Sequence, residues 1–175
     1  MEVAIIKNEW GVVAFSLFPI GVIAWANDER GVLNSVEDNL YDYCNWLNCK
    51  LPKEVKPVVK ERYVGEIATI SFKADDKKLF KKYGEIVLQT AFSFKSMLDS
   101  ASLSTEDIES VERVFERLSF RKGEGVLERS ATILESENFG VAREFIYRIY
   151  RLAKELYFSL KGQGKEVIDT FKFDI

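Results

Sequence analysis

The chain has 175 residues, of which 47% are hydrophobic and 30% charged, a composition typical of one ordinary globular domain or two small ones. Its formal net charge of -3 argues against non-specific nucleic-acid binding, which needs clustered Lys and Arg. It contains no histidine, which excludes serine–histidine triads, cysteine–histidine pairs and the usual zinc sites but leaves a carboxylate-only metal site or a Lys or Tyr base open.

The N-terminal part predicts three β-strands, over residues 2–7, 11–18 and 21–26. Two of them fall within residues 10–26, a run without charge that approaches the length needed to span a bilayer. Two buried strands explain this run better, because Pro19-Ile20-Gly21 suits a turn and weakens a helix. The run is also rich in β-branched and aromatic residues, which favour strands. We therefore expect no membrane segment and no membrane partner.

A helix is predicted next, beginning at Asn27-Asp28, whose side-chain oxygens can accept hydrogen bonds from the free amides of a first helical turn. Its apolar residues recur at three- and four-residue steps, as expected of a helix that packs on a sheet. They are Val32, Leu33, Val36, Leu40, Cys44 and Leu47. A connector over 51–56, which contains Pro52 and is followed by Pro57, precedes two more predicted strands at 58–64 and 66–73.

From residue 77 the hydrophobic pattern becomes helical almost throughout. The predicted helices run over residues 77–100, from 104 or 105 onward, over 125–137 and over 139–161. Ser104 and Asp107 have the spacing of a capping box at the start of the second helix. Four amphipathic helices with short links indicate a bundle-like region. The tail, 166–173, has some strand character and could extend the sheet.

The two cysteines, Cys44 and Cys49, are five residues apart. On a single helix their side chains would lie about 140° apart around the axis, where they could neither bond readily nor share a metal ion. The sequence therefore predicts two reduced, partly buried thiols in a cytoplasmic protein.

Three glutamates in the helical region, Glu137, Glu144 and Glu155, could suggest a di-metal carboxylate site. Such a site pairs glutamates with histidines facing a bundle core, and the histidines are missing. Glu144 lies four residues before Arg148, and Arg151 four before Glu155, which is the spacing of solvated ion pairs. We interpret these charges as structural.

Two basic groups are the other candidates for a binding site. Arg113, Arg117 and Arg121 recur every four residues, but acidic residues between them indicate a charge-laced exposed face. The densest basic group is Lys77, Lys78, Lys81 and Lys82, interpreted as another solvated face. No glycine-rich phosphate loop is present. We assign no catalytic, cofactor-binding or metal-binding residue and expect no cofactor.

The order of elements in residues 1–73 resembles the N-terminal domain of HicB-type antitoxins. It comprises the hairpin, the turn at 19–21, the short strand 22–24 and the helix opening at 27–30. The apolar helix positions Val32, Leu33, Val36 and Leu40 fall where that family's helix buries its face. The resemblance implies a βββαβ domain that pairs with a partner or with itself.

The sequence also departs from the HicB pattern. Ile20 is inserted between the proline and the glycine of the turn, and no ribbon-helix-helix or helix-turn-helix segment follows. The helical region instead makes the arrangement similar to HicB-like domains fused to DinB-like bundles. In DinB-like proteins a histidine triad binds metal, and this chain cannot supply one.

We thus predict an α+β fold, with a small mixed sheet and one packed helix in βββαββ order, followed by a four-helix, bundle-like region. Residues 1–75 would form the HicB-like domain and 76–175 the helical domain, possibly packed as one unit. The leading function is a non-catalytic binding or assembly module, a homodimer or bound to a protein partner. A histidine-independent enzyme, with a carboxylate, Lys or Tyr pocket between sheet and helices, and a nucleic-acid-associated regulator are the alternatives. Few Gln and Met beside abundant Glu and Lys favour a thermophilic source.

Overall fold

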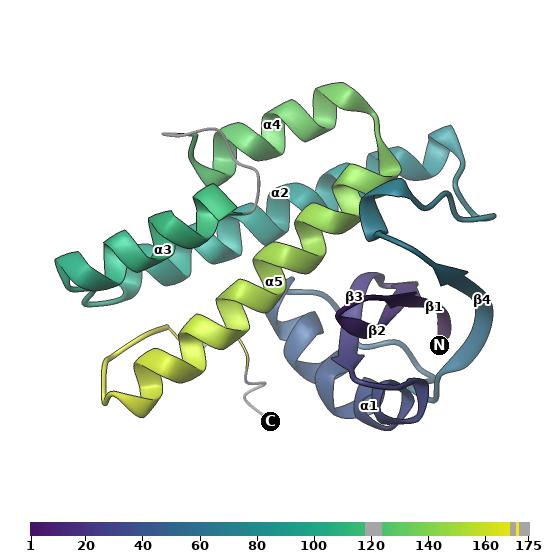
Figure 1. The fold of residues 1–175 in the computed structure, drawn as a ribbon, viewed down its shortest axis with the longest axis horizontal. Helices are drawn as coiled ribbons and strands as arrows, with labels where there is room; N and C mark the ends of the chain where they lie inside the picture. Colours follow the sequence, from purple (N-terminus) through teal and green to yellow (C-terminus); the bar gives the residue numbers. More distant parts are fainter. Residues whose placement is uncertain (118–123, 169–170, 172–175) are drawn as a thin grey trace.

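The computed structural model describes residues 1–117, 124–168 and 171, and its mixed α+β fold confirms the predicted class. Within the described chain, four strands form one sheet in the order β3-β2-β1-β4 (Figure 1). The first three are antiparallel neighbours, and the helix after β3 is the crossover that lets β4 run parallel to β1. These elements are β1 (Glu2–Asn8), β2 (Gly11–Leu17), β3 (Ile20–Ala26), α1 (Glu29–Trp46) and β4 (Val58–Val64).

The uncharged run folds back on itself as β2 and β3, which confirms the strand interpretation. After the turn at Phe18-Pro19, Gly21 adopts a φ of 146°. A Cβ there would meet the Tyr43 hydroxyl at 1.5 Å, and this hydroxyl donates to the Ile20 carbonyl oxygen at 2.8 Å. Glycine is therefore what allows Tyr43 of α1 to reach β3. Among the described residues, no helix is long and apolar enough to cross a membrane.

Helix α1 covers one face of the sheet, and both of its ends follow from local sequence. As predicted, it is capped at its start, where Asp28 Oδ1 accepts from the Gly31 backbone N–H at 2.7 Å. It ends at Trp46, because Asn48 takes a left-handed conformation with φ 50°. The predicted apolar stripe is buried at Val32, Val36, Leu40, Cys44 and Leu47, whereas Leu33 is only partly buried.

The predicted strand at 66–73 is absent from this described segment, which instead forms the short 3₁₀ helix η1 (Ile67–Thr69) and an irregular stretch. The spacing of its two buried residues explains the difference. Ile67 and Phe72 are both buried in the core, but five residues apart on a strand they would point to opposite faces. One turn of helix after Gly65, whose φ is 137°, lets both side chains enter the core.

The helical region follows the sequence pattern closely. Helix α2 has the predicted bounds, and the residues that flank α4 on either side, Gly125 and Glu137, act as its caps. The elements are α2 (Lys77–Ser100), α3 (Thr105–Arg117), α4 (Val126–Ser136) and α5 (Phe139–Gly162). Helices α2 and α5 are the long ones, and α5 runs across the sheet side of this region (Figure 1).

The C-terminal tail adds no strand where it is described. Residues 166–168 lie outside any strand, and the rest of the predicted segment, apart from Phe171, falls outside the described residues. Phe171 is buried, and its ring stacks on Trp46 with 5.1 Å between ring centroids. This residue therefore packs in the core rather than at a sheet edge.

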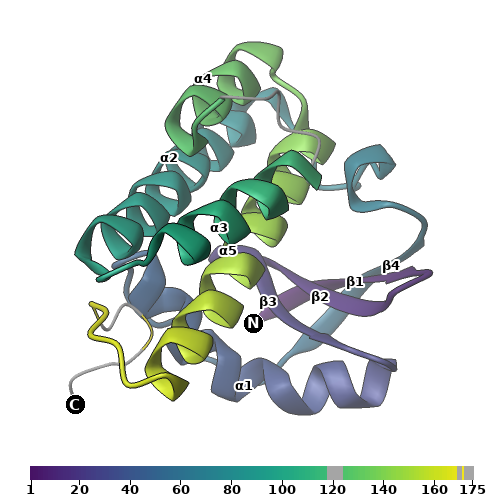
Figure 2. The same ribbon diagram turned by 60° about the vertical axis from the view of Figure 1, so that its left-hand side comes forward.

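The sheet lies between α1 on one side and the helices α2 to α5 on the other (Figure 2). The middle parts of β1 and β2 are buried on both faces of the sheet, and the apolar core is continuous from the sheet to α2 and α5. Phe15 of β2, for example, stacks on Tyr83 of α2 with ring centroids 6.3 Å apart. The two predicted regions are therefore packed against each other, and their division into two domains at residue 75 stays a prediction.

A buried arginine ties the segment after η1 to the helices. Arg143 of α5 has no exposed surface and donates from both terminal nitrogens to Asp75, at 2.7 and 3.1 Å. It also donates to the Ile70 carbonyl oxygen and, at 3.4 Å, to the Tyr83 hydroxyl. Its guanidinium carbon lies 3.9 Å from the ring centre of Phe72. This charge is compensated by a bidentate carboxylate, as a buried charge requires.

Candidate functional site

A groove of about 890 Å³ lies at one end of the sheet. The parallel strands β1 and β4 both end there, and the turn between β1 and β2 forms its rim. The middle of α5 forms the opposite wall. Because side chains and connections at the carboxyl ends of parallel strands converge, this edge is where open α/β sheets commonly bind ligands. We take this groove as the candidate site.

The sheet wall of the groove is positioned by backbone hydrogen bonds. Asn8 Oδ1 accepts from the Trp10 backbone N–H at 2.9 Å, which fixes the turn. The Gly65 N–H donates to the Lys7 carbonyl oxygen at 2.9 Å, so the chain after β4 stays beside β1. Two large apolar side chains stand out from this wall, Trp10 with 80% and Val64 with 84% of their surface exposed. Both line the groove.

The helix wall presents two arginines that are held in place by their neighbours. Arg148 Nε donates to Glu144 at 2.7 Å, and Arg151 Nε donates to Glu155 at 2.8 Å. Arg151 also donates to the Tyr147 hydroxyl at 2.9 Å. These contacts confirm the two ion pairs predicted from the four-residue spacing. Side chains fixed in this way lose little conformational freedom when a ligand binds.

A half-buried aromatic pair supports the helix wall. The Trp25 ring of β3 meets Tyr147 edge to face, with centroids 6.3 Å apart, and the Arg151 guanidinium carbon lies 5.5 Å from the Trp25 ring centre. Partial burial opposes the charge of Arg151, but the hydrogen bonds that it donates to Glu155 and Tyr147 outweigh this effect and raise the pKa of this arginine. The cation is therefore a fixed feature of the groove.

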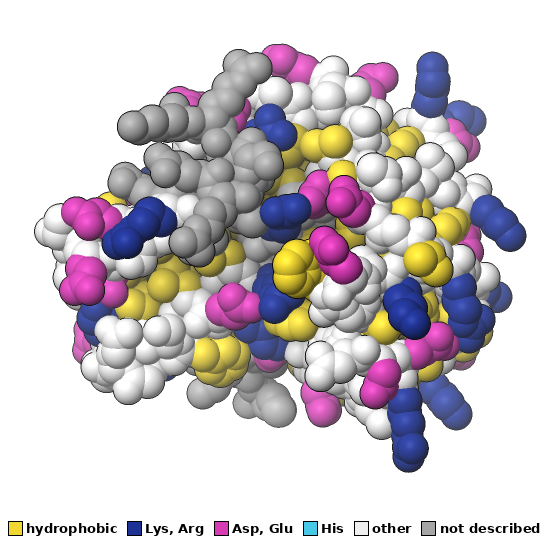
Figure 3. All heavy atoms as spheres, viewed as in Figure 1, with side chains coloured by type: hydrophobic (Ala, Val, Ile, Leu, Met, Phe, Trp, Pro, Cys, Tyr) yellow, Lys and Arg dark blue, Asp and Glu magenta, His cyan; other side chains and the backbone are white. Residues whose placement is uncertain are grey.

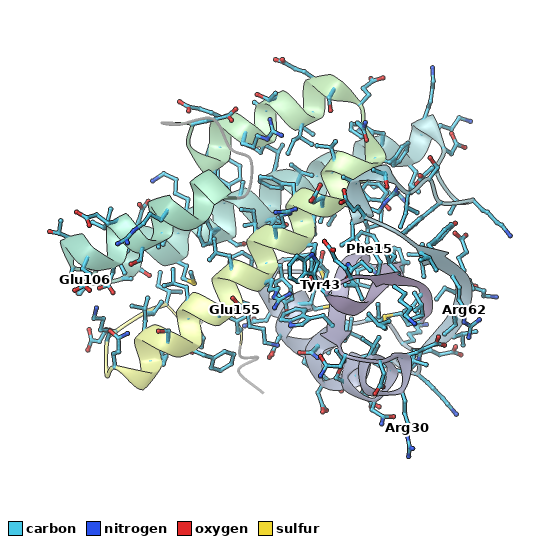
Figure 4. The ribbon with its side chains drawn as sticks, viewed as in Figure 1. Phe15, Arg30, Tyr43, Arg62, Glu106 and Glu155 are labelled. Carbon is cyan, nitrogen blue, oxygen red and sulfur yellow. The ribbon has the colours of Figure 1, made fainter. Side chains whose placement is uncertain are left out.

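The charges of the groove nearly balance. Its lining includes three basic side chains and four acidic ones, which are Lys7, Arg148, Arg151, Glu9, Glu66, Glu144 and Glu155. On the molecular face shown in Figure 3, basic and acidic side chains likewise alternate with hydrophobic ones. In Figure 4, Glu155 stands on α5 toward the surface, whereas Tyr43 lies in the interior between α1 and α5. Such a mixture suits a polypeptide ligand better than a polyanion.

The groove lies between sheet and helices, where the hypothesis of a histidine-independent enzyme requires its pocket. It holds a lysine, a tyrosine and carboxylates, which are Lys7, Tyr147, Glu144 and Glu155. Both carboxylates on α5 already accept hydrogen bonds from arginines, and the tyrosine hydroxyl accepts one from Arg151. Such carboxylates are placed to hold arginines in position, and we assign none of these groups a catalytic role.

The three glutamates considered for a di-metal site are not brought together. Glu137 is the C-terminal cap of α4, with φ 48°, and it does not line the groove that holds Glu144 and Glu155. Among the residues that the structure describes, no three Cys, Asp or Glu side chains are grouped so that they could bind a metal ion.

Where the structure describes them, the two basic groups lie away from the groove. Arg113 pairs with Glu109 at 3.9 Å on an exposed helix face, while the Arg117 side chain and Arg121 fall outside the described residues. The lysine group lies exposed on the first turns of α2, comprising Lys77, Lys78, Lys81 and Lys82. The sequence interpretation as solvated faces fits these positions.

The sequence analysis considered the two cysteines as if both lay on one helix, but only Cys44 lies on α1. Helix α1 ends at Trp46, so Cys49 lies beyond it. The neighbouring Cys49 thiol, together with burial, raises the pKa of Cys44, and the neighbouring Cys44 thiol lowers the pKa of Cys49. Both cysteines are free thiols, Cys44 buried and Cys49 partly exposed.

The sequence analysis missed the residues of the sheet wall. Lys7, Trp10 and Val64 carry no motif, and they meet α5 only because β4 pairs with β1 over a long separation in sequence. One signal was present, namely a tryptophan in a predicted tight turn, where a large apolar side chain has little to pack against.

Comparisons with protein-family models, with curated proteins and with solved structures gave no match. The HicB-like relationship therefore stays a prediction based on the order of elements. The argument for function depends on the groove itself.

Proposed function

We propose that this chain is a non-catalytic binding and assembly protein that binds another polypeptide in the groove between the β1–β2 turn and α5. The observation that carries the proposal is the position of Trp10. Its side chain is 80% exposed at the rim, opposite a wall that contains Tyr147, Arg148 and Arg151. Trp, Tyr and Arg are the residue types that dominate binding energy at protein interfaces.

The energetics favour a macromolecular occupant. Burial of a large apolar side chain contributes about 1.5–3 kcal/mol, and neither Trp10 nor Val64 gains this in the isolated chain. A drug-sized ligand is usually enclosed on most of its surface, whereas this groove has exposed side chains along its rim. A chain segment that lies along the groove would cover both apolar side chains and meet charges of both signs.

The occupant we propose is a second copy of this chain. An isologous dimer places the same patch against itself, so a patch that contains both signs of charge can pair basic with acidic groups across the two-fold axis. The groove has three basic and four acidic side chains and meets this requirement. The HicB-like resemblance of residues 1–73 adds support, because it implies a module that pairs with itself or with a partner.

Light scattering after size-exclusion chromatography at high micromolar concentration tests the dimer. We expect the wild-type chain to have twice the mass of one chain, and Trp10→Ala to weaken association at least tenfold, the loss expected for a buried interface tryptophan. Phe158→Ala is the matched control, because Phe158 is 52% exposed but does not line the groove. A monomeric wild type, or a dimer that Trp10→Ala leaves unchanged, would contradict the proposal.

A further inference from the structure

We propose that Cys44 and Cys49 form a thiol–disulfide redox site at the C-terminal end of α1. The site would react with small-molecule disulfides, of which oxidised glutathione is the type, and close to an intrachain disulfide. It is separate from the groove, since neither cysteine lines it.

The geometry of the helix end brings the two thiols together. The Asn48 N–H donates to the Asn45 carbonyl oxygen and the Cys49 N–H to the Cys44 carbonyl oxygen, both at 2.9 Å, with Asn48 left-handed. This is the Schellman pattern, in which the third residue from the helix end and the second residue beyond the cap place their side chains in contact. In this helix those two positions are occupied by Cys44 and Cys49.

The backbone spacing also permits a disulfide. A backbone hydrogen bond of 2.9 Å from Cys49 N to Cys44 O ties the two residues directly. With standard bond lengths, the two Cα atoms can then lie no farther apart than about 6.8 Å, the upper limit for disulfides. Because the Schellman pattern places these two side chains next to each other, the two sulfur atoms can approach without a change in the backbone.

The two cysteines differ in a way that assigns them distinct roles. Cys49 is partly exposed, and its lowered pKa favours the thiolate, the form that attacks disulfides. Cys44 is fully buried, and its neighbouring thiol is the main cause of the lowered pKa of Cys49. A small disulfide can therefore reach Cys49 first, and Cys44 is placed behind it as the resolving thiol.

The reaction balances as two exchanges. The Cys49 thiolate attacks one sulfur of the small disulfide, the sulfur–sulfur bond breaks, and one small thiolate leaves and takes up a proton. Cys44 then loses its proton and attacks the Cys49 sulfur of the mixed disulfide, which displaces the second small thiolate. The cysteine pair is oxidised by two electrons, and the small disulfide is reduced to two thiols.

The test equilibrates the full chain in glutathione buffers of increasing oxidised fraction, followed by acid quenching and mass spectrometry. We expect the wild type to lose the mass of two hydrogen atoms and to run as a monomer on a non-reducing denaturing gel. Thiols that can be alkylated after denaturation should fall from two to none. Reduction with excess reduced glutathione should restore both.

Two variants distinguish the roles. Cys44→Ser should stop at a glutathione adduct on Cys49, whereas Cys49→Ser should leave Cys44 unreactive in the folded chain. The wild-type result decides the proposal even where a variant folds poorly. A wild-type chain that stays reduced in fully oxidised buffer, accumulates the adduct without closing, or forms only interchain disulfides would overturn it.

Discussion

Helix α5 carries three arginines that belong to two different regions of the molecule. Arg143 lies in the seam between the helices and the segment after η1, with no exposed surface and hydrogen bonds to Asp75, Ile70 and Tyr83. Arg148 and Arg151 lie one and two turns further along, at the groove, where 38% and 41% of their side-chain surfaces are exposed.

The difference between these regions shows that burial and ion-pair partners decide whether an arginine stabilises the fold or faces a possible ligand. The seam is filled, and its arginine charge meets a nearly buried carboxylate from a distant part of the chain. The groove is open, and its arginines pair only with glutamates on their own helix. We infer that the seam stabilises the fold, whereas the groove leaves its arginines available to a ligand without a large stability cost.

The largest effect is expected at the seam, for Arg143→Ala. This change leaves the nearly buried Asp75 carboxylate without its bidentate partner and opens a cavity beside Phe72. Removal of one member of a buried ion pair typically costs about 3–5 kcal/mol, and we expect a loss in that range. Urea unfolding measures it. Arg143→Lys should recover only part of the loss, because an ammonium group cannot make the bidentate contact.

A loss of less than about 1 kcal/mol for Arg143→Ala would contradict the comparison, because this is the range of exposed ion pairs. In that case the seam and the groove would use their arginines in the same way.

Features that depend on neighbouring residues in the chain could be predicted from the sequence, whereas the seam and the groove could not. The strands, the Asp28 cap and the helix bounds of α2 were predictable, because they depend on local periodicity and capping chemistry. The seam and the groove were not, since each joins residues far apart in the chain, as Asp75 and Arg143 are. The strand prediction at 66–73 failed because alternation describes a strand but cannot reveal that Ile67 and Phe72 both turn into the core.

The second-largest effect is expected at alkaline pH, where the ionisation of Tyr83, a hydrogen-bond partner of Arg143 in the seam, changes stability. Burial raises the pKa of Tyr83 to about 12, although the nearby Arg143 charge lowers it in part. Above the ordinary tyrosine pKa the unfolded chain gives up this proton first, so stability should fall as pH rises from about 10 to about 12. For a shift of this size the Tyr83 contribution amounts to about 2–3 kcal/mol.

Urea unfolding at several alkaline pH values measures this contribution, and Tyr83→Phe should remove its share of the pH dependence. Other buried tyrosines contribute as well, because burial also raises the pKa of Tyr43 and Tyr150. The difference between wild type and Tyr83→Phe therefore isolates the residue at the seam. Parallel curves from pH 10 to 12 would mean that Tyr83 ionises as readily in the folded chain as in the unfolded one.

The smallest effect on stability is expected at the groove, for Arg148→Ala. Arg148 and Glu144 are 38% and 27% exposed and one helical turn apart, and such pairs contribute about 0.3–0.5 kcal/mol. A double-mutant cycle with Glu144→Ala should return a coupling energy of that size by urea unfolding. The same Arg148→Ala variant should weaken self-association in light scattering, because the fixed guanidinium belongs to the proposed interface. A coupling energy near that expected at the seam would mean that this wall of the groove serves the fold, and the binding surface would then have to be sought elsewhere.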